Sequence, residues 1–423
     1  MSALALILLG GIVALGFLGN LFFERTRIPD VLFLIGAGLL LGPVFALVAP
    51  GAVRPAMPYF GALALVIILF DGGLDLELSH LVGQAGRALL LLTLSFGITL
   101  ILIYPILGYG LQLAGIPAWT TAAALSCTSA PILIPILGKL VPKSPVGSLL
   151  TIESSLSDAL AVILVLFLLD LESVGAQGAI LPISFLMDIG ISLILAVIAG
   201  WLWLWILSHF SRRAFFSFLT VGYVFLLVGI IEILGGSGAV AALVFGVTLA
   251  NGEAFAQLWG RENRDLIASY FQNHHLILDS KIREAQSEIS LLVRTFFFVY
   301  IGIIFHGFGF TPVQWLTILC IFVLILAARF ISVSVLGHLW QTPKNDKLLM
   351  NAMISRGLAT AVLAAIIAGE YPEIRTTIMS LAFVLIILTN LTMTLMTLFI
   401  REKVNLPEPS QVGIEATPNA AQE

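Results

Sequence analysis

Seven ionisable side chains lie inside long apolar stretches of the sequence, where a charge is costly and usually serves a function. They are Asp71, Glu153, Asp158, Glu232, Arg294, Arg329 and Arg356. If each stretch is a helix that crosses a membrane, Glu232 and Arg294 fall near its ends, and both side chains can extend to the surface. The other five lie deeper, and they are the candidates for chemistry with ions or protons.

Three polar side chains from different stretches fall at one depth. A helix rises 1.5 Å per residue, so Asp158 lies about 18 Å, Thr128 about 17 Å and Arg356 about 15 Å into its stretch. The hydrocarbon core of a bilayer is about 30 Å thick. A carboxylate, a hydroxyl and a guanidinium are therefore expected near the middle of the membrane, where the carboxylate can hold either a proton or a cation.

The acids of the sixth stretch divide between two faces. Glu153 and Asp158 point about 140° apart on a helix and do not form an acid/base pair, whereas Ser154 and Asp158, four residues apart, share a face. Glu153 lies about 25 Å and Arg329 about 24 Å from the outer end of its helix. Because an unpaired charge in a membrane is costly, this match predicts a salt bridge.

Two stretches are interrupted at their centres. The fifth contains Thr128, Ser129, Pro131 and Pro135, and prolines remove backbone donors and free carbonyls. Irregular backbone at this depth is tolerated where it is buried or lines a cavity, which favours a binding site over a simple proline kink, although both interpretations remain open. Ser355-Arg356-Gly357 interrupts the twelfth stretch in the same way.

Composition shows that these stretches are membrane helices. Of the 423 residues, 59% are hydrophobic and 10% are charged, and the mean hydropathy is +1.08. A water-soluble globule could not bury so much apolar surface. The net charge of −4 provides no basic face for nucleic acid. The two cysteines suggest neither a disulfide framework nor a zinc site, and no phosphate-binding glycine loop supports ATP-driven transport.

The sequence predicts an all-α polytopic membrane protein with about 13 transmembrane helices. A length of about 20 apolar residues per helix gives the stretches 3–24, 31–50, 58–78, 88–112, 117–138, 146–169, 179–208, 215–234, 237–252, 288–310, 313–340, 346–369 and 375–400. Of the 20 Lys and Arg residues, 15 then lie in loops on one side and two on the other. Positive charge collects in the cytoplasm, so we expect a cell-membrane protein with its N-terminus outside and its C-terminus inside.

The order of the interrupted stretches suggests an internal repeat. The fifth and twelfth are seven apart and so run in opposite directions, which makes residues 1–170 and 215–400 candidate inverted-topology repeats of six helices. Interrupted helices at matching positions indicate the binding site of a secondary transporter. We expect one transmembrane domain over 1–400 and a disordered cytoplasmic tail over 401–423. The loop 253–287 is a connector or, alternatively, an amphipathic surface helix.

Six stretches carry a resemblance to a known family. They are Phe70-Asp71-Gly72-Gly73-Leu74, Thr128-Ser129-Ala130-Pro131, Glu153-Ser154-Ser155-Leu156-Ser157-Asp158, Arg294-Thr295-Phe296-Phe297-Phe298-Val299-Tyr300-Ile301-Gly302, Ala328-Arg329-Phe330 and Ser355-Arg356-Gly357-Leu358. In this order they resemble the monovalent cation/proton antiporters, in particular the NhaP-type sodium/proton antiporters and their animal relatives. The segment from Glu153 to Asp158 is the most specific, because it resembles the family's Glu-Ser-x-x-Asn-Asp motif.

The resemblance implies a role for each candidate residue. Asp158 would be the site of cation and proton, with the Thr128 carbonyl, the Ser154 hydroxyl and Asp71 as further cation ligands. Crossed, unwound helices would surround the site. The resemblance also implies two structural roles. Glu153 would form an ion pair with Arg329, and Arg356 would compensate the charge at the unwound end of the twelfth helix.

The resemblance also implies partners and a stoichiometry. A single aspartate in the motif implies electroneutral exchange of one monovalent cation for one proton, without a cofactor, in a homodimer that moves a core domain against a fixed dimerisation domain. Ser157 and Ser129 stand at the site where the family usually has Asn and Asp. Sodium is the cation expected first, but these two differences leave lithium and potassium open.

Two other functions are compatible with parts of the sequence. An inverted-repeat carrier of organic anions would use Arg356 to bind a carboxylate. An intramembrane hydrolase would use Ser154 or Ser157 with Asp158, but no histidine falls near the middle of the membrane, which disfavours a Ser-His arrangement. A passive channel would require a repeated filter sequence, which is not found.

Overall fold

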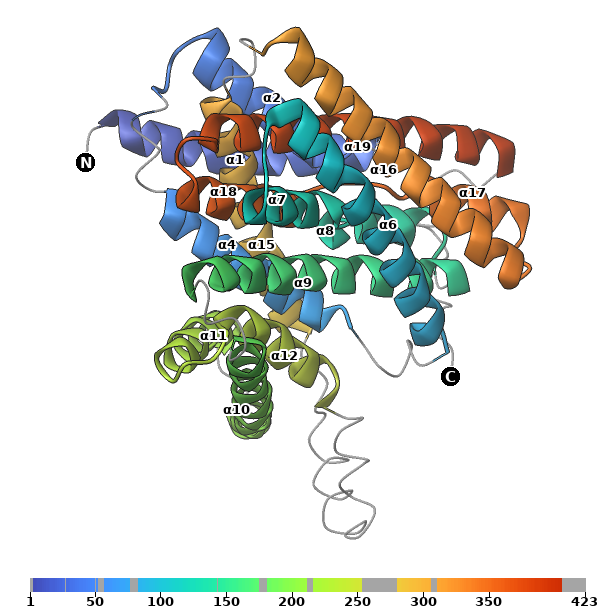
Figure 1. The fold of residues 1–423 in the computed structure, drawn as a ribbon. Helices are drawn as coiled ribbons and strands as arrows, with labels where there is room; N and C mark the ends of the chain where they lie inside the picture. The colour runs from blue at the N-terminus through green and yellow to red at the C-terminus, as the bar shows by residue number, and fades with distance from the viewer. Residues whose placement is uncertain are drawn as a thin grey trace, which may run out of the picture.

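The computed structural model describes residues 3–26, 28–49, 51, 57–76, 83–142, 144–174, 181–210, 216–252, 280–305 and 310–404. Within these ranges every regular element is a helix, which confirms the all-α prediction. Residues 253–279 and 405–423 lie outside the described residues, so the expectations for them stay predictions. Residues 280–287, expected in the loop, belong to α15, and residues 401–404, expected in the tail, belong to α19. Figure 1 shows long helices packed side by side, with α10, α11 and α12 at one edge of the bundle.

Each predicted stretch coincides with one helix or with two consecutive short helices. The elements are α1 (Ala3–Thr26), α2 (Asp30–Leu39), the π-helical turn η1 (Leu40–Val44), α4 (Met57–Leu74), α6 (Ala85–Leu111), α7 (Ile116–Ser126), α8 (Ala130–Leu140), α9 (Pro145–Val174), α10 (Leu181–Phe210), α11 (Phe216–Ile233), α12 (Gly238–Ala250), α15 (Ser280–Ile304), α16 (Pro312–Leu339), α17 (Lys344–Ala352), α18 (Leu358–Glu370) and α19 (Arg375–Val404). Seven stretches of the described chain are long and apolar enough to cross a membrane, and five shorter helices are also apolar. Thirteen crossings therefore remain a prediction.

The two interrupted stretches become two pairs of half-helices. Residues 127–129 separate α7 from α8, and residues 353–357 separate α17 from α18. Pro131 stands in the first turn of α8, where a missing N–H costs little and the fixed φ suits a helix. The two breaks touch, because the N–H of Ser129 donates to the carbonyl of Ser355 at 3.0 Å. The irregular backbone predicted from the prolines and Gly357 thus satisfies part of its own hydrogen bonding.

Packing divides the helices into two groups. The core group contains α6 to α9 and α16 to α19, and it surrounds the two breaks. The scaffold group contains α1, α2, α4, α10, α11, α12 and α15. The groups meet along α4, α9, α15 and α18. Each group combines helices from both predicted repeats, as an inverted-repeat arrangement would require.

Glycines allow the scaffold helices to approach closely. A Cβ on Gly73 of α4 would collide with the backbone of α12, and one on Gly246 of α12 would collide with the backbone of α4. Gly38 of α2 and Gly302 of α15 stand in the same relation. Small residues at such crossings maximise van der Waals packing between membrane helices. These two crossings hold four helices of the scaffold together.

Candidate ion-binding site

Asp158 is a buried carboxylate on α9, with 3% of its surface exposed. Its Oδ2 accepts a hydrogen bond of 3.1 Å from the N–H of Ala130, the first residue of α8. The amino end of a helix carries partial positive charge and favours an anion. Oδ1 is buried and has no hydrogen-bond partner in the part of the chain that the structure describes. The carboxylate is thus tied to α8 through one oxygen, the Cys127 thiol lies beside it, and Oδ1 is available to a ligand.

The serines around Asp158 play different structural parts. Ser157 accepts a hydrogen bond of 3.0 Å from the N–H of Thr128 and so ties α9 to the break. The hydroxyl of Ser154, predicted to face the ion, donates to the carbonyl of Thr151 at 3.1 Å. Ser155 instead lines a cavity with Asp158, and its Oγ has no partner among the described residues. Ser155 and Asp158 are three residues apart and share a helix face, a signal that sequence reasoning passed over.

Two neighbouring cavities lead to Asp158. The smaller has a volume of about 50 Å³ and is lined by Asp158, Ser155 and Ala130. Since about 10–15 Å³ of such space suffices for one water molecule, this cavity can hold a small cation or a few water molecules. The larger has a volume of about 540 Å³ and shares Asp71 and Pro131 with the smaller. The open cavity therefore adjoins the small one at Asp158.

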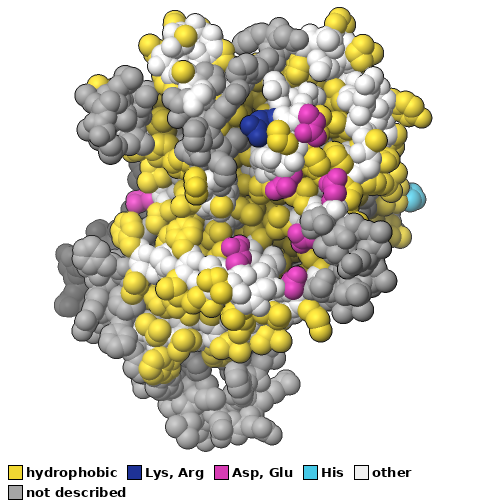
Figure 2. All heavy atoms as spheres, turned by 60° about the vertical axis from the view of Figure 1, so that its left-hand side comes forward, with side chains coloured by type: hydrophobic (Ala, Val, Ile, Leu, Met, Phe, Trp, Pro, Cys, Tyr) yellow, Lys and Arg dark blue, Asp and Glu magenta, His cyan; other side chains and the backbone are white. Residues whose placement is uncertain are grey.

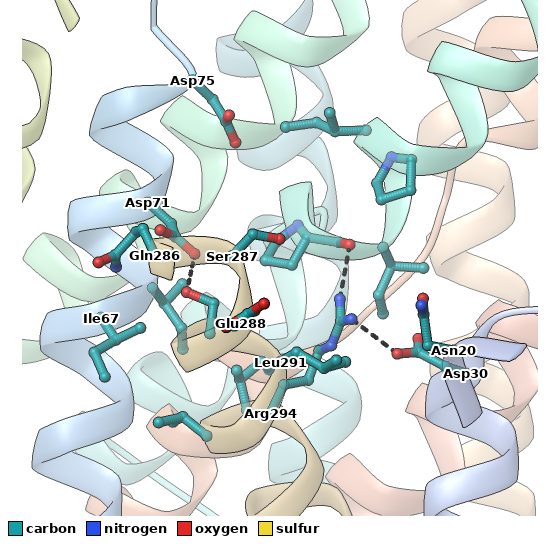
Figure 3. A pocket seen from close by; sticks show the side chains of 18 of the residues that line it. Asn20, Asp30, Ile67, Asp71, Asp75, Gln286, Ser287, Glu288, Leu291 and Arg294 are labelled. Atoms are coloured by element: carbon teal, nitrogen blue, oxygen red, sulfur yellow. Dashed lines mark hydrogen bonds and ion pairs between the residues drawn. The ribbon is translucent and has the colours of Figure 1, made fainter. Parts of the chain in front are cut away.

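The larger cavity lies between the two groups of helices (Figure 3). Its charged lining residues are Asp30, Asp71, Asp75, Glu288 and Arg294. Asp75 and Glu288, at the end of α4 and in the first turns of α15, are exposed, so the cavity opens on the side predicted to be cytoplasmic. Four carboxylates against one guanidinium create a field that concentrates cations.

Asp71 lies in both cavities, and it is partly buried. The hydroxyl of Ser290 donates to its Oδ2, and the side chain of Gln286 lies beside it (Figure 3). Gln286 is 3% exposed, and its buried amide lies against the Asp71 carboxylate. Ser290 and Gln286, both on α15, were not singled out from the sequence.

Carboxylates also gather at the other end of the molecule. Figure 2 shows acidic side chains around a hollow on the face that lies to the left in Figure 1, where the N-terminus lies. Glu172 of α9 and Glu370 of α18 are exposed at helix ends. Glu232 is exposed as well, as expected for a charge near a helix end.

Glu153 and Arg329 form a buried ion pair. The two terminal nitrogens of Arg329 contact the two oxygens of Glu153 at 2.7 and 3.0 Å, and its Nε donates to the carbonyl of Met350 at 2.8 Å. The exposed fractions are 1% and 3%. The structure thus brings together the two residues that were paired by depth. The pair joins α9 to α16 and to the end of α17.

Arg356 stands at the centre of the second break. Its Nε donates to the carbonyl of Leu125, near the end of α7, and its Nη1 donates to the carbonyl of Ile354, both at 2.9 Å. Thr389 and Asn390 of α19 bind its backbone. A cation beside free carbonyls at a helix carboxyl end is stabilising. Two nitrogens of its guanidinium thus bind carbonyls of the interrupted helices, the arrangement expected of a residue that compensates an unwound helix end.

Arg294 corrects one expectation. It was expected to extend from the inner end of its helix to the surface, but its side chain is 16% exposed and its Nη2 lies 2.8 Å from Oδ2 of Asp30. Its Nη1 donates to the carbonyl of Pro131 at 3.1 Å. Asp30 is the first residue of α2 and was not counted among the membrane charges. Arg294 is therefore stabilised by an ion pair with Asp30 inside the protein and not by water at the surface.

A family model described as "Sodium/hydrogen exchanger, transmembrane" matches residues 10–401. The chain belongs to this family. The K(+)/H(+) antiporter NhaP2 of Shewanella sp. (strain ANA-3) is 28% identical over 237 residues, which span 54% of this chain and 40% of that protein. The Na(+)/H(+) antiporter 1 of Methanocaldococcus jannaschii is 23% identical over 303 residues, or 70% of this chain and 67% of that protein.

Solved structures of the exchanger family share the fold. The sodium proton antiporter MjNhaP1 from Methanocaldococcus jannaschii superposes with a TM-score of 0.76 at 21% identity, over 97% of this chain and 100% of the other. A second structure of MjNhaP1, at pH 8, gives a TM-score of 0.74 over 95% and 98% of the two chains. The helical arrangement is therefore that of a membrane exchanger.

At Gly357 the two helix breaks cross so closely that a side chain does not fit. A Cβ there would collide with the hydroxyl of Ser129, whose backbone makes the hydrogen bond between the breaks. Gly357→Ala should therefore lower thermal stability in detergent and reduce exchange at least tenfold, because overpacking displaces both breaks. Gly369→Ala is the matched control, since a Cβ at Gly369 meets nothing within 4 Å. Equal thermal stability and equal exchange rates in the two variants would show that the crossing is not tightly packed.

Proposed function

We propose that this exchanger-family protein is a monovalent cation/proton antiporter of a cell membrane, with Asp158 as the site that binds both ions. The observation that carries the proposal is the free Oδ1 of Asp158 beside a small cavity that adjoins an open one. The carboxylate can hold a proton or a cation, but not both. Competition for one oxygen couples the two fluxes without a second site.

Nearby oxygens complete the cation site in this proposal. Ser155 lines the same cavity as Asp158, and Asp71 lies between the small and the large cavity. The carbonyl of Thr128 and the hydroxyls of Ser129, Ser154 and Ser157 remain candidates by family resemblance. Oxygen donors suit a hard cation such as sodium, lithium or potassium. The proton needs only the Asp158 carboxylate.

Alternating access would follow from the two groups of helices. The large cavity opens between core and scaffold on the predicted cytoplasmic side. If the core carries Asp158 past the scaffold, the same site opens to the other face, as in rocking-type secondary transport. A homodimer held through the scaffold, as in the family, would keep the scaffold fixed while the core moves.

The transported cation is best determined by direct comparison. Purified protein is reconstituted into liposomes that contain a pH-sensitive dye, and sodium, lithium or potassium is added at several pH values. We expect cation-induced proton release with sodium and a bell-shaped pH dependence, because proton and cation exclude each other. A signal with potassium alone would assign the K(+)/H(+) specificity named for NhaP2. No signal with any of the three would contradict the proposal.

Charge balance gives a further expected result. With one exchanging carboxylate, each cycle moves one cation against one proton, and no net charge crosses the membrane. Imposing a membrane potential of either sign with valinomycin and potassium should leave the rate of sodium/proton exchange unchanged. The measurement is the initial rate of dye response in the same liposomes. A clear acceleration would indicate unequal stoichiometry and make Asp71 a second proton carrier.

A further inference from the structure

A proline in α8 leaves one carbonyl next to the ion site without its usual partner. In an α-helix, the N–H of residue i+4 donates to the carbonyl of residue i. The residue four positions after Pro131 is Pro135, which has no N–H. Arg294 of α15 supplies the missing donor, with its Nη1 3.1 Å from the carbonyl oxygen of Pro131. A guanidinium from the scaffold thus completes a turn of the core.

The same guanidinium is anchored within the scaffold. Its Nη2 lies 2.8 Å from Oδ2 of Asp30, at the start of α2. The other oxygen of Asp30 accepts the N–H of Val31 at 3.0 Å, so the carboxylate is itself fixed. Both side chains are largely buried, with exposed fractions of 16% and 10%. Figure 3 shows Arg294 between Asp30 on one side and α8 on the other.

The turn that Arg294 holds is the one that contacts Asp158. Pro131 follows Ala130, and the N–H of Ala130 donates to Oδ2 of Asp158. Residues of this turn line both cavities, with Pro131 in the wall of each. A shift of the turn would therefore move a hydrogen bond of the ion-binding carboxylate and reshape the path to it.

We propose that Arg294 is a positioning residue for the cation site: anchored by Asp30, it replaces the donor that Pro135 removes and holds α8 against the scaffold while the cavity is open at Asp75 and Glu288. This inference rests on the proposed antiport function. The ion pair between Arg294 and Asp30 lies within the scaffold, so it can persist when the core moves. The hydrogen bond from Arg294 to the carbonyl of Pro131 joins the scaffold to the core, so it must break during that movement. Arg294 thus stabilises one of the two access states and the site geometry in that state.

The test compares the two faces of the membrane. Exchange is measured in right-side-out and everted vesicles, so that the cation is offered to each face in turn. Arg294→Gln should weaken apparent cation affinity about tenfold on the face of Asp75 and Glu288, the order of effect expected for one charge-assisted hydrogen bond. Affinity at the other face should change less than twofold or improve. Arg294→Lys should recover part of the loss, because it keeps the charge but not the fork geometry.

Electrostatics alone predicts the opposite sign. Removing a positive charge from a cation cavity should strengthen cation binding, so a weaker affinity in Arg294→Gln reports positioning. Glu288→Gln is the matched control on the same helix and cavity. It should weaken affinity slightly through the field, and the loss should disappear at high ionic strength. Tighter binding in Arg294→Gln, or equal losses at both faces, would overturn the proposal.

Pro135→Ala tests the cause directly. Alanine restores an N–H that can donate to the carbonyl of Pro131, and position 135 is exposed, so the substitution creates no large cavity. In this background Arg294→Gln should change the sided affinity less than twofold. If Arg294→Gln weakens the apparent cation affinity by the same tenfold with either proline or alanine at position 135, Arg294 does not act through that carbonyl, and the inference fails. Such a result, with exchange intact in the wild type, would leave the proposed function standing, whereas absence of wild-type exchange would count against the function itself.

Discussion

Asp158→Asn should abolish cation/proton exchange at every pH. An amide can still accept the hydrogen bond from Ala130, so the fold around the first turn of α8 should survive. It cannot lose a proton, however, and the negative charge that would hold the cation is absent. The expected result is a loss of dye response by at least two orders of magnitude in liposomes, with a thermal transition close to that of the wild type.

A carboxylate elsewhere on the same helix serves as the control for Asp158. Asp170 lies three turns further along α9 and is exposed. Asp170→Asn removes the same charge from the same helix and should retain most of the exchange activity. Exchange that persists in Asp158→Asn at any pH between about 5 and 9, on either side of the ordinary histidine pKa, would place the coupling site elsewhere, with Asp71 as the next candidate.

The sequence predicted the features that depend on depth and on backbone chemistry. Prolines 131 and 135 removed donors from the fifth stretch, and the structure has a break at residues 127–129, directly before the first turn of α8, which contains Pro131. Depth arithmetic matched Glu153 with Arg329, and the two side chains are in contact. Both inferences work because a membrane helix has a known rise per residue and tolerates few unpaired groups.

Other parts of the site depend on which helices are neighbours, which helical depth does not reveal. Asp30 lies just outside the predicted stretch 31–50, and its partner Arg294 is 264 positions away in the sequence. Ser290 and Gln286 approach Asp71 only because α15 packs on α4. Ser155 shares a face with Asp158 as Ser154 does, and only the packing of α4 and α8 against α9 determines which hydroxyl borders the cavity. The sequence gives the depth of each residue in its helix, but it does not give the rotation of each helix about its own axis, which decides which side chains face the site.

The ion pair between Glu153 and Arg329 gives the second large expected effect. Removing one partner leaves a buried charge without compensation, which costs about 3–5 kcal/mol in proteins generally. Glu153→Gln and Arg329→Gln should each lower the thermal transition in detergent markedly. The Arg329 variant also leaves the carbonyl of Met350 without the donor it has in the wild type, so its loss should be the larger of the two.

The double variant Glu153→Gln/Arg329→Gln should recover most of that stability, because the desolvation of two buried charges offsets much of their attraction. The coupling between the substitutions, obtained from the four transition temperatures, measures the pair. Exchange should persist in the double variant, since Asp158 and its bond to Ala130 are untouched. Simple addition of the two single losses would mean that the contact contributes nothing to stability. A stable double variant without exchange would instead make Glu153 part of the proton path, because charge at that position would then be needed for transport and not for the fold.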